Sequence, residues 1–412
     1  MSFSSFGLCD PLQQAVSHFD QCTEVQQAAI PLVLAGGDVL VTAPTGSGKT
    51  TAFVLPLLER WLAASRQQRR PLHTLILVPT RELAAQVREV VQQLARHLPE
   101  KLKVVSAVGG VSINPQMMAL RGGADIVVAT PGRLLDLVDH NAVQLSALSA
   151  LVLDEADRLL DLGFSDELKR ILTLLPKQRQ TLMFSATFPA AVENMALDLL
   201  RDPARVEMND EVADAPDIKQ RAIRVDTAKR APLLRHLITT QKWQQVLVFV
   251  AKQYGADHVA DKLRRNGIKA LSFHGGLSQG ARSDALMDFK DREVQVLVAT
   301  DLAARGLDVV SLPVVINYDL PRSPVDYTHR IGRTGRAGES GLAISFVTAD
   351  SNAQFCLIEK RQGLNVAREE LPGFEPSESA PAASVSKGAG GIKGRRKSKK
   401  DKLREAAARE QG

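Results

Sequence analysis

Short aliphatic runs recur along the chain in two series. The first series lies at 39–41, 75–78, 126–128, 151–153 and 182–184, and the second at 246–250, 296–298, 314–316 and 343–346. Runs of this length are typical of strands that are buried on both faces of a parallel sheet. Segments with helical character lie between them, for example 82–98 and 257–266. The alternation predicts an α/β fold with two tandem domains, each built on a parallel sheet.

An acidic segment separates the two series. Residues 209–217 include a proline and lack a strong apolar period. We therefore expect a first domain over 1–208, a linker over 209–219 and a second domain over 220–366. Ser, Ala, Pro and Gly then dominate 377–391, which predicts a flexible tail over 367–412. No short repeat relates the two halves at this level.

The amino-acid composition is typical of a globular protein and argues against several other classes of protein. Of 412 residues, 44% are hydrophobic and 24% are charged, so the chain has ample material for buried cores. The three cysteines form no CxxC pair, which argues against a disulfide framework and a zinc site and fits a reducing compartment. No apolar run approaches the ~18 residues of a membrane span, and residues 1–5 lack the pattern of a secretory signal. We expect a soluble, cytoplasmic protein without a membrane partner.

The net charge of +6 is unevenly distributed. Residues 387–412 hold ten Lys or Arg and three Asp or Glu, a net of +7, which leaves −1 for the rest of the chain. A basic tail attracts polyanions, most often nucleic acid. The alternative is a solvated end without a specific partner, and composition alone leaves both interpretations open.

One segment after the first aliphatic run has the composition of a phosphate-binding loop. Glycines let the backbone curl so that several N–H groups face one point, and a following helix N-terminus completes an anion site. The lysine would add positive charge at the outer phosphates, and the threonine hydroxyl would bind Mg²⁺. Alanine stands where the generic pattern has its first glycine. The segment consists of Ala43, Pro44, Thr45, Gly46, Ser47, Gly48, Lys49 and Thr50.

Acidic residues follow the run 151–153 directly. Asp154 and Glu155 would stand at the carboxyl end of a strand, which is the ligand side of an open α/β sheet. Asp154 can hold Mg²⁺, and Glu155 can orient and deprotonate an attacking water. A solvated acidic turn is the alternative for such a tetrapeptide alone. The phosphate loop about 100 residues upstream makes the pair far more specific.

These segments resemble the motifs of the DEAD-box RNA helicases, and the resemblance covers roughly residues 3–350 in the expected order. It implies two RecA-like domains, ATP and Mg²⁺ as cofactors, and RNA as a partner bound through its backbone without sequence preference. The short basic tail resembles that of bacterial RhlE-like members, which act in ribosome assembly or RNA turnover. We expect a monomer that hydrolyses ATP to ADP and phosphate.

The residues before the phosphate loop resemble the family's adenine-reading Q motif. An amide both donates and accepts hydrogen bonds, so Gln26 can read the edge of adenine, and Phe19 could stack on the base. Core packing is the alternative for Phe19. Phe3 resembles the isolated aromatic residue upstream. The chain departs from the motif at His18, where the family has glycine, and at Cys22, where it has proline.

Further segments resemble the family's RNA-facing and coupling motifs. The resemblance implies that Ser185, Ala186 and Thr187, with Asp157 and His329, couple the nucleotide site to unwinding. Exposed N–H groups, threonine hydroxyls and arginines suit phosphates and sugars. The residues expected at RNA are Pro79, Thr80, Arg81, Gly109, Gly110, Thr130, Pro131, Gly132 and Arg133 in the first domain and Gln279, Arg282, Thr300 and Gly306 in the second.

Three arginines spaced by three occupy the segment 329–336. Burying so much positive charge without anions would be costly, so we expect the segment to face phosphate. By resemblance, Arg333 and Arg336 are arginine fingers for the γ-phosphate, and Asp308 contacts the ribose hydroxyls. A salt-bridged basic loop is the alternative.

The expected half-sites lie in different domains, so hydrolysis should require the domains to close and RNA and ATP should bind with coupled affinities. Closure would open short duplexes locally. Three other interpretations remain: an ATP-gated RNA clamp, a DNA helicase of the same superfamily and a non-catalytic binding module. Gln26 and Asp157 favour RNA over DNA, and no catalytic position is visibly lost.

Overall fold

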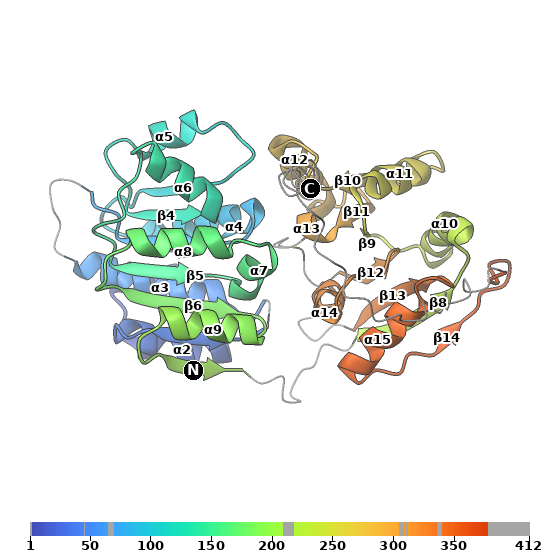
Figure 1. Cartoon of the computed structure of the whole chain (residues 1–412), viewed down its shortest axis with the longest axis horizontal. Helices are drawn as coiled ribbons and strands as arrows, with labels where there is room; N and C mark the ends of the chain where they lie inside the picture. Colours follow the sequence, from blue (N-terminus) through green and yellow to red (C-terminus); the bar gives the residue numbers. More distant parts are fainter. Residues whose placement is uncertain are drawn as a thin grey trace, which may run out of the picture.

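The computed structural model describes residues 2–44, 46–64, 70–208, 218–304, 309, 312–335 and 340–377. They form two α/β domains that lie side by side, each with a central sheet covered by helices (Figure 1). Every strand pairing in both sheets is parallel. The predicted fold class is confirmed.

The first sheet has seven strands in the order β3-β4-β2-β5-β6-β1-β7. Its strands are β1 (Val39–Thr42), β2 (Thr74–Leu77), β3 (Val104–Ala107), β4 (Ile126–Ala129), β5 (Ala150–Leu153), β6 (Gln180–Ser185) and β7 (Ala204–Glu207). Its helices are α1 (Asp10–Ala15), α2 (Glu24–Leu34), α3 (Lys49–Ala63), α4 (Arg81–Leu94), α5 (Asn114–Leu120), α6 (Pro131–Asp139), α7 (Ala156–Asp161), α8 (Ser165–Leu174) and α9 (Ala190–Leu199).

The second sheet also has seven strands, in the order β10-β11-β9-β12-β13-β8-β14. Its strands are β8 (Ile218–Arg224), β9 (Val246–Val250), β10 (Ala270–Phe273), β11 (Val296–Thr300), β12 (Val314–Asn317), β13 (Gly341–Val347) and β14 (Arg368–Glu369). Its helices are α10 (Arg230–Gln241), α11 (Gln253–Arg264), α12 (Gln279–Lys290), α13 (Asp301–Ala304), α14 (Pro324–Ile331) and α15 (Asn352–Gln362). When the strands of each sheet are numbered from that sheet's own first strand, the two sheets have the same strand order. The two halves therefore share a topology, although no sequence repeat between them is visible.

Alternate residues of each strand enter different cores, which explains the continuous aliphatic runs. Val39 and Val41 of β1 pack in a cluster with Phe53 of α3. Leu40, between them, packs in the opposite cluster with Leu151 and the helices α6, α8 and α9. All five side chains are buried, and each such burial stabilises the fold by about 1.5–3 kcal/mol.

All nine aliphatic runs are strands in the structure, while five further strands carry no such run. Four of the five are edge strands or, like β8, lie next to an edge: β3, β7, β8 and β10 have exposed or half-buried positions. The fifth, β14, has only two residues. Because one side of these strands needs little apolar surface, a search for continuous aliphatic runs does not find them.

The expected domain boundaries differ from the elements in two places. Residues 209–217 of the expected linker lie outside the described residues, and the next residue, Ile218, already begins β8. Beyond the expected end of the second domain at 366, Arg368–Glu369 still pairs with β8. Phe374 then packs on the apolar cluster of this domain, and the Ser377 N–H donates to Asp226 at 2.9 Å. The basic tail, 387–412, lies outside the described residues.

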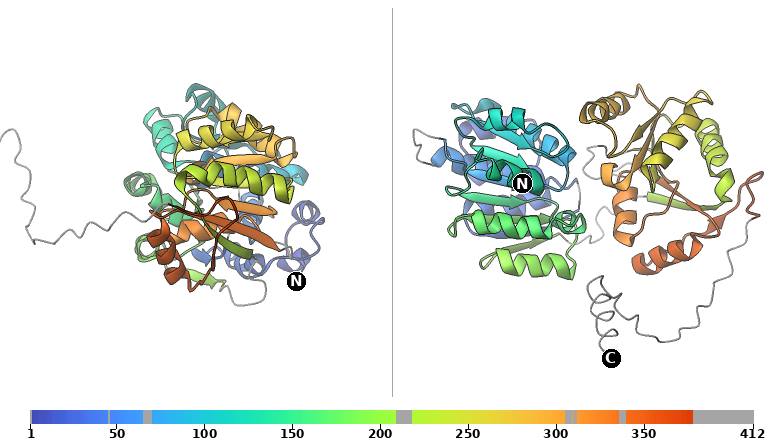
Figure 2. Two further views of the ribbon diagram at one scale, coloured as in Figure 1. Left: turned by 90° about the vertical axis from the view of Figure 1, so that its right-hand side faces the viewer. Right: turned by 45° about the horizontal axis from the view of Figure 1, so that its top comes forward.

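The carboxyl end of the first sheet faces the second domain (Figures 1 and 2). Helix α7 starts there and contacts α14, and helix α4 contacts α12, in both cases through an ion pair. This edge of the sheet is where the phosphate loop and the acidic residues were predicted. The two domains therefore meet at the predicted site.

Candidate active site and RNA interface

The phosphate loop leaves β1 and enters α3 at Lys49. Gly46 and Gly48 have φ values of 81° and 90°, a region that side chains disfavour. A Cβ at Gly48 would also collide with the amide of Gln26. Lys49 is buried, and its ammonium donates to the carbonyls of Ala43 and Pro44 at the mouth of the loop. The loop has the form of an anion site at a helix N-terminus; Thr45 lies outside the described residues.

Gln26 connects helix α2 to this loop. Its Oε1 accepts from the N–H of Thr23 at 3.0 Å and its Nε2 donates to the Gly48 carbonyl at 3.3 Å. The first bond belongs to a capping box, because the Thr23 hydroxyl accepts from the Gln26 N–H in return. The side chain is therefore held by both segments, and the loop conformation depends on it.

Phe19, which belongs to the same predicted motif as Gln26, is half-exposed, with 46% of its surface accessible. Its ring lies 3.9 Å from the ring of His18 and 6.0 Å from that of the buried Phe3. The interpretation of Phe19 as an ordinary core residue is therefore wrong. His18, which replaces the family's glycine, provides a ring against which Phe19 rests.

The two carboxylates at the end of β5 are buried together. Asp154 Oδ1 accepts from the Glu155 N–H at 3.0 Å. Glu155 adopts a left-handed conformation, with φ 50° and ψ 55°, which is rare for a side-chain-bearing residue and typical of functional sites. Its Oε2 is buried and has no hydrogen-bond partner within the described part of the chain. Such an oxygen needs a water or ligand donor.

The pKa values of both carboxyls lie above their ordinary values. Burial, followed by the charge of Glu155, raises the pKa of Asp154 to about 7, although Lys49 opposes the shift. Burial also raises the pKa of Glu155, against the opposing charges of Arg158 and Arg333. A divalent cation would offset the desolvation of Asp154 and restore its charged form.

Asp157 joins the acidic segment to the end of β6. Its carboxylate accepts from the Thr187 hydroxyl at 2.8 Å and from the Thr187 N–H at 3.1 Å. Its own N–H donates to the Ser185 hydroxyl at 3.4 Å. The structure thus brings together three of the predicted coupling residues in one hydrogen-bond network.

His329 and Arg333 reach the same region from the second domain. Burial, together with Arg158 and Arg333, lowers the pKa of His329 to about 3, so its imidazole is neutral. The Nε2 atom is buried and has no hydrogen-bond partner among the described residues. Arg333 is buried, and its charge acts on Glu155 across the domain boundary. Arg336 and Asp308, which were predicted at the nucleotide, and Gly306, which was predicted at RNA, lie outside the described residues.

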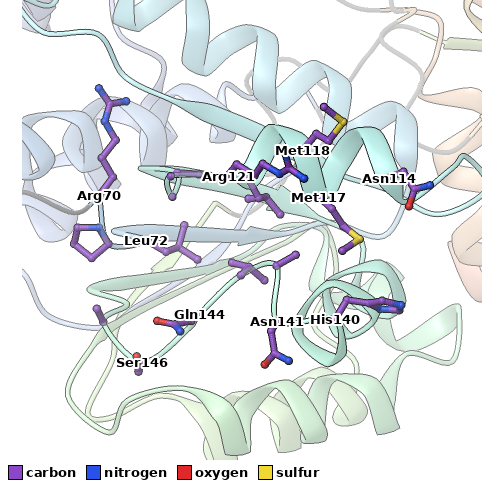
Figure 3. Close-up of a pocket in the computed structure, with 18 residues that line it drawn as sticks. Arg70, Leu72, Asn114, Met117, Met118, Arg121, His140, Asn141, Gln144 and Ser146 are labelled. Carbon is purple, nitrogen blue, oxygen red and sulfur yellow. The ribbon is translucent and has the colours of Figure 1, made fainter.

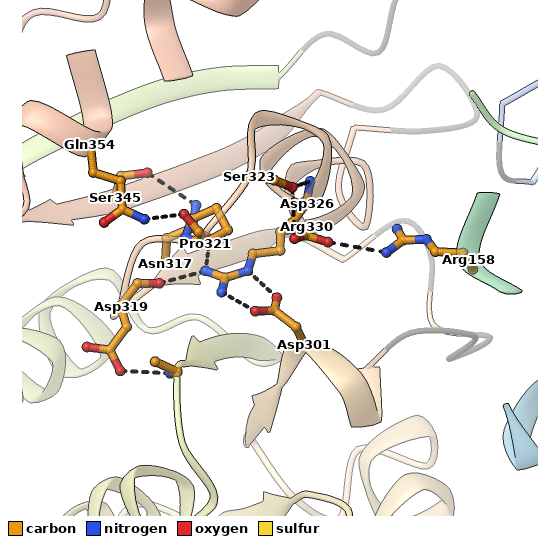
Figure 4. Close-up of polar contacts among 11 residues, drawn as sticks. Arg158, Asp301, Asn317, Asp319, Pro321, Ser323, Asp326, Arg330, Ser345 and Gln354 are labelled. Carbon is orange, nitrogen blue, oxygen red and sulfur yellow. Dashed lines mark hydrogen bonds and ion pairs between the residues drawn. The ribbon is translucent and has the colours of Figure 1, made fainter. Parts of the chain in front are cut away.

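Arg330 corrects one expectation about the arginine-rich segment. Its side chain is 2% exposed and forms a bidentate ion pair with Asp301, with N–O distances of 2.5 and 2.7 Å (Figure 4). Its remaining donors reach Asn317 Oδ1 at 2.9 Å and the Asp319 carbonyl at 2.6 Å. Burial of this charge is compensated within the domain, so Arg330 does not face phosphate.

Two ion pairs between the domains were not predicted from the sequence. Arg158, directly after the acidic tetrapeptide, lies 3.3 Å from Asp326 of α14 (Figure 4). Arg282 of α12 lies 2.8 Å from Glu82 of α4, and both side chains are at most 7% exposed. No local sequence signal identifies such pairs, because the partners are 168 and 200 residues apart. They join the domains around the nucleotide-facing edge.

Most predicted RNA residues of the first domain form a connected group. Thr80 caps α4 by accepting from Leu83, and Arg81 donates to the Gly109 carbonyl at 3.3 Å. Arg133, near the start of α6, donates to the Val111 carbonyl at 2.8 Å. Gln116, which sequence analysis did not single out, bonds both the N–H and the carbonyl of Val108 at 3.0 Å and so holds this loop.

The remaining predicted RNA residues lie at helix starts, in the loop after β3 or at the end of β11. Pro79 and Thr80 precede α4, while Thr130, Pro131 and Gly132 open α6. An added Cβ at Gly109 or Gly132 would meet nothing, so backbone is accessible there, whereas Arg81 covers Gly110. In the second domain, Gln279 opens α12 and Thr300 ends β11, where it is buried. The guanidinium of Arg282 forms an ion pair with Glu82 of the first domain.

Within the described residues, no group of three or more His, Cys, Asp or Glu side chains could hold a metal. None of the described helices is long and apolar enough to cross a membrane.

Comparisons with known proteins agree with this geometry. The DEAD/DEAH box helicase family matches residues 23–195, and the helicase conserved C-terminal domain matches residues 228–338. The ATP-dependent RNA helicase DbpA of Escherichia coli is 43% identical over 85% of this chain and 73% of its own length. The DEAD-box ATP-dependent RNA helicase CshA of Bacillus subtilis is 36% identical over 90% of this chain and 74% of its own.

Solved structures of RNA-bound relatives share the arrangement of the two domains. S. cerevisiae Dbp5 bound to RNA and ADP BeF3 has a TM-score of 0.79 at 31% identity, covering 90% of this chain and 95% of the other. Mss116p bound to ssRNA and AMP-PNP has a TM-score of 0.81 at 28% identity, covering 91% and 79%. The chain belongs to the DEAD-box family of ATP-dependent RNA helicases, and it binds ATP and RNA and hydrolyses ATP in response to RNA.

Proposed function

We propose that this helicase hydrolyses ATP at a composite site formed only when its domains close on RNA. The buried, unpaired Oε2 of Glu155 supports this most directly. It lies where Lys49 of the first domain and Arg333 of the second domain both exert their charges. A carboxylate so placed suits a general base that holds the attacking water.

The other residues have roles that follow from their positions. Lys49 and the N–H groups of the loop bind the outer phosphates. Arg333, with Arg336 by family resemblance, neutralises charge that develops on the γ-phosphate. Gln26 and Phe19 hold the adenine, and Asp308 by resemblance holds the ribose. The network of Asp157, Ser185 and Thr187, with Ala186 between the last two, transmits the state of the site to the RNA-facing edge.

Mg²⁺ fits the residues present. The pKa of Asp154 is raised to about 7 mainly by burial, so this oxygen gains from a neighbouring cation. Thr50 follows Lys49 in the first turn of α3 and offers a hydroxyl. The ion would supply charge neutralisation at the phosphates, while Asp154 and Thr50 would hold it.

We further propose local unwinding of short duplexes or remodelling of RNA–protein complexes, through backbone contacts without sequence preference. Ribosome assembly or RNA turnover is the cellular setting that the resemblance to short-tailed bacterial members suggests. An ATP-gated RNA clamp shares every residue of the site. A strand-displacement assay with a short duplex separates the two activities, since a clamp would bind the duplex without releasing a strand.

Glu155→Gln tests the composite site. The amide keeps the size of the side chain but cannot accept a proton, so turnover should fall at least a hundredfold while ATP-dependent RNA binding remains. Glu193→Gln, an exposed change on α9, is the matched control and should keep the parent rate. Hydrolysis by Glu155→Gln at the parent rate would show that another group is the base.

A further inference from the structure

A cavity of about 940 Å³ opens on the first domain at the sheet edge opposite the active site. Three loops form it, and these loops enter the amino ends of β2, β4 and β5, while helix α5 supplies another wall. The phosphate loop and the acidic residues lie at the carboxyl ends of the same sheet. A ligand in this cavity would therefore leave the nucleotide and RNA sites accessible.

The cavity has an apolar floor and an apolar rim. Leu72, Leu120 and Ala124 are buried beneath it. Met117 approaches from α5, across the hollow from the loop that carries Asn141 and Gln144 (Figure 3). Met118, which also lines the cavity, is 62% exposed and, unlike Met117, is not among the described side chains packed against the apolar cluster of this side of the sheet. Methionine is flexible and polarisable, which suits a surface that adapts to an apolar side chain.

Charge on this surface has one sign. The described residues that line the cavity include Arg70 and Arg121 but no Asp or Glu. Arg70 is partly neutralised by Asp125 at 3.3 Å. Arg121 is exposed, and the Lys103 ammonium reaches its carbonyl at 2.7 Å, which adds a second cation beside it. An incoming segment with carboxylates would be attracted.

Two other occupants fit less well. The residues that line the cavity include no Phe, Tyr or Trp, so single-stranded RNA lacks the large aromatic rings on which its bases usually stack. The chain's own tail, 387–412, has a net charge of +7 and would be repelled by the arginines. A segment that carries both acidic and apolar residues would complement the positive charge and the apolar floor of the cavity.

We propose that this cavity docks an acidic peptide segment of a partner protein, with a bulky apolar residue seated against Met117 and Met118 and a carboxylate at Arg121. Asn141, Gln144 and Ser146 offer polar groups to its backbone. Docking at this edge would bring the helicase to a partner's RNA without occupying the catalytic cleft. The proposal is independent of the roles assigned to the active-site residues.

Selection from a phage-displayed library of random twelve-residue peptides on the full chain tests the proposal. Enriched peptides should carry Asp or Glu next to Leu, Ile or Phe. By fluorescence anisotropy, Arg121→Glu and Met118→Glu should each weaken a labelled enriched peptide at least tenfold. Arg88→Glu, on the exposed face of α4, should not. RNA-stimulated ATPase should stay within twofold in all three variants.

The following results would contradict the proposal. Failure to enrich any peptide that depends on Arg121 or Met118 would overturn the proposal, and so would enrichment of neutral or basic peptides alone. Photocrosslinking of a ribo-oligonucleotide to residues 117–121, abolished by Arg121→Glu, would assign the surface to RNA instead. Intact ATPase in these variants separates this failure from failure of the proposed catalytic site.

Discussion

Arg282 Nη2 of α12 lies 2.8 Å from Glu82 Oε1 of α4, so an ion pair buried from solvent joins the two domains. The resemblance to family motifs predicted RNA as the partner of Arg282. In this conformation its guanidinium instead lies 5.2 Å from the ring of Phe273 and is committed to a carboxylate of the other domain. Removing one member of a buried pair typically costs about 3–5 kcal/mol, because a lone charge remains.

A double-mutant cycle measures what this pair contributes to closure. Glu82→Gln and Arg282→Met should each weaken RNA binding in the presence of a non-hydrolysable ATP analogue by at least tenfold. The double variant should be weakened by far less than the product of the two effects, with a coupling energy above about 1 kcal/mol. Strictly multiplicative losses would show that Glu82 and Arg282 act separately, with Arg282 on RNA alone.

Arg158 and Asp326 form the second link between the domains, and charge exchange tests it. Arg158→Asp or Asp326→Arg alone should lower RNA-stimulated ATPase at least tenfold, since each puts two like charges where the parent has an ion pair at 3.3 Å, in a site at most 15% exposed. The exchanged double variant should recover much of the loss. The exposed pair Arg170 and Asp139 is the control: Arg170→Asp should change the rate less than twofold.

The sequence could predict the parts of this site that are contiguous. The phosphate loop, the acidic tetrapeptide and the nine central strands each lie within a few residues, where composition and spacing carry the information. The ion pairs at Glu82 and Asp326 could not be predicted, because each depends on two helices from different domains. The shared strand order of the halves was also hidden, since strands at or next to a sheet edge, such as β7 and β8, have no distinctive apolar pattern.

Arg330 shows a second limit of sequence reasoning. A buried arginine needs a counter-charge, which a ligand phosphate or a carboxylate of the protein can supply equally well. From the spacing of the arginines alone, we expected phosphate. The structure supplies Asp301, 29 residues upstream, together with Asn317 and a carbonyl. Arg333 is three residues on, and its charge instead acts on Glu155. The contacts made in the fold distinguish these two arginines, whereas their residue type and spacing do not.

Gln26 can be tested for base selectivity as opposed to a structural role. Gln26→Ala removes the bonds to Thr23 and Gly48, so kcat/KM for ATP should fall at least tenfold. If the amide also reads adenine, the preference for ATP over GTP should fall by a similar factor. Gln27→Ala, which removes one bond to the Cys22 carbonyl, is the control and should preserve the preference. An unchanged preference in Gln26→Ala would restrict Gln26 to loop support.

The basic tail should add affinity for RNA without sequence preference. Deleting 387–412 removes a net charge of +7, so RNA affinity should fall and its dependence on salt should flatten. The comparison is a plot of log affinity against log salt concentration for the full chain and the truncated protein. The ATPase rate at saturating RNA should be unchanged. Equal slopes and affinities would remove the tail from RNA binding.

His329 should make closure sensitive to acid. Its pKa is lowered to about 3 by burial and by Arg158 and Arg333, and domain opening should return it toward its ordinary value near 6.5. The open state then binds more protons below pH 6.5, so closure is favoured above this pH and lost as the pH falls. ATP-analogue-dependent RNA affinity should therefore drop about tenfold more between pH 7.5 and 5.5 in the parent than in His329→Gln. The exposed His97→Gln should keep the parent's dependence, and equal slopes in parent and His329→Gln would show that His329 does not titrate with closure.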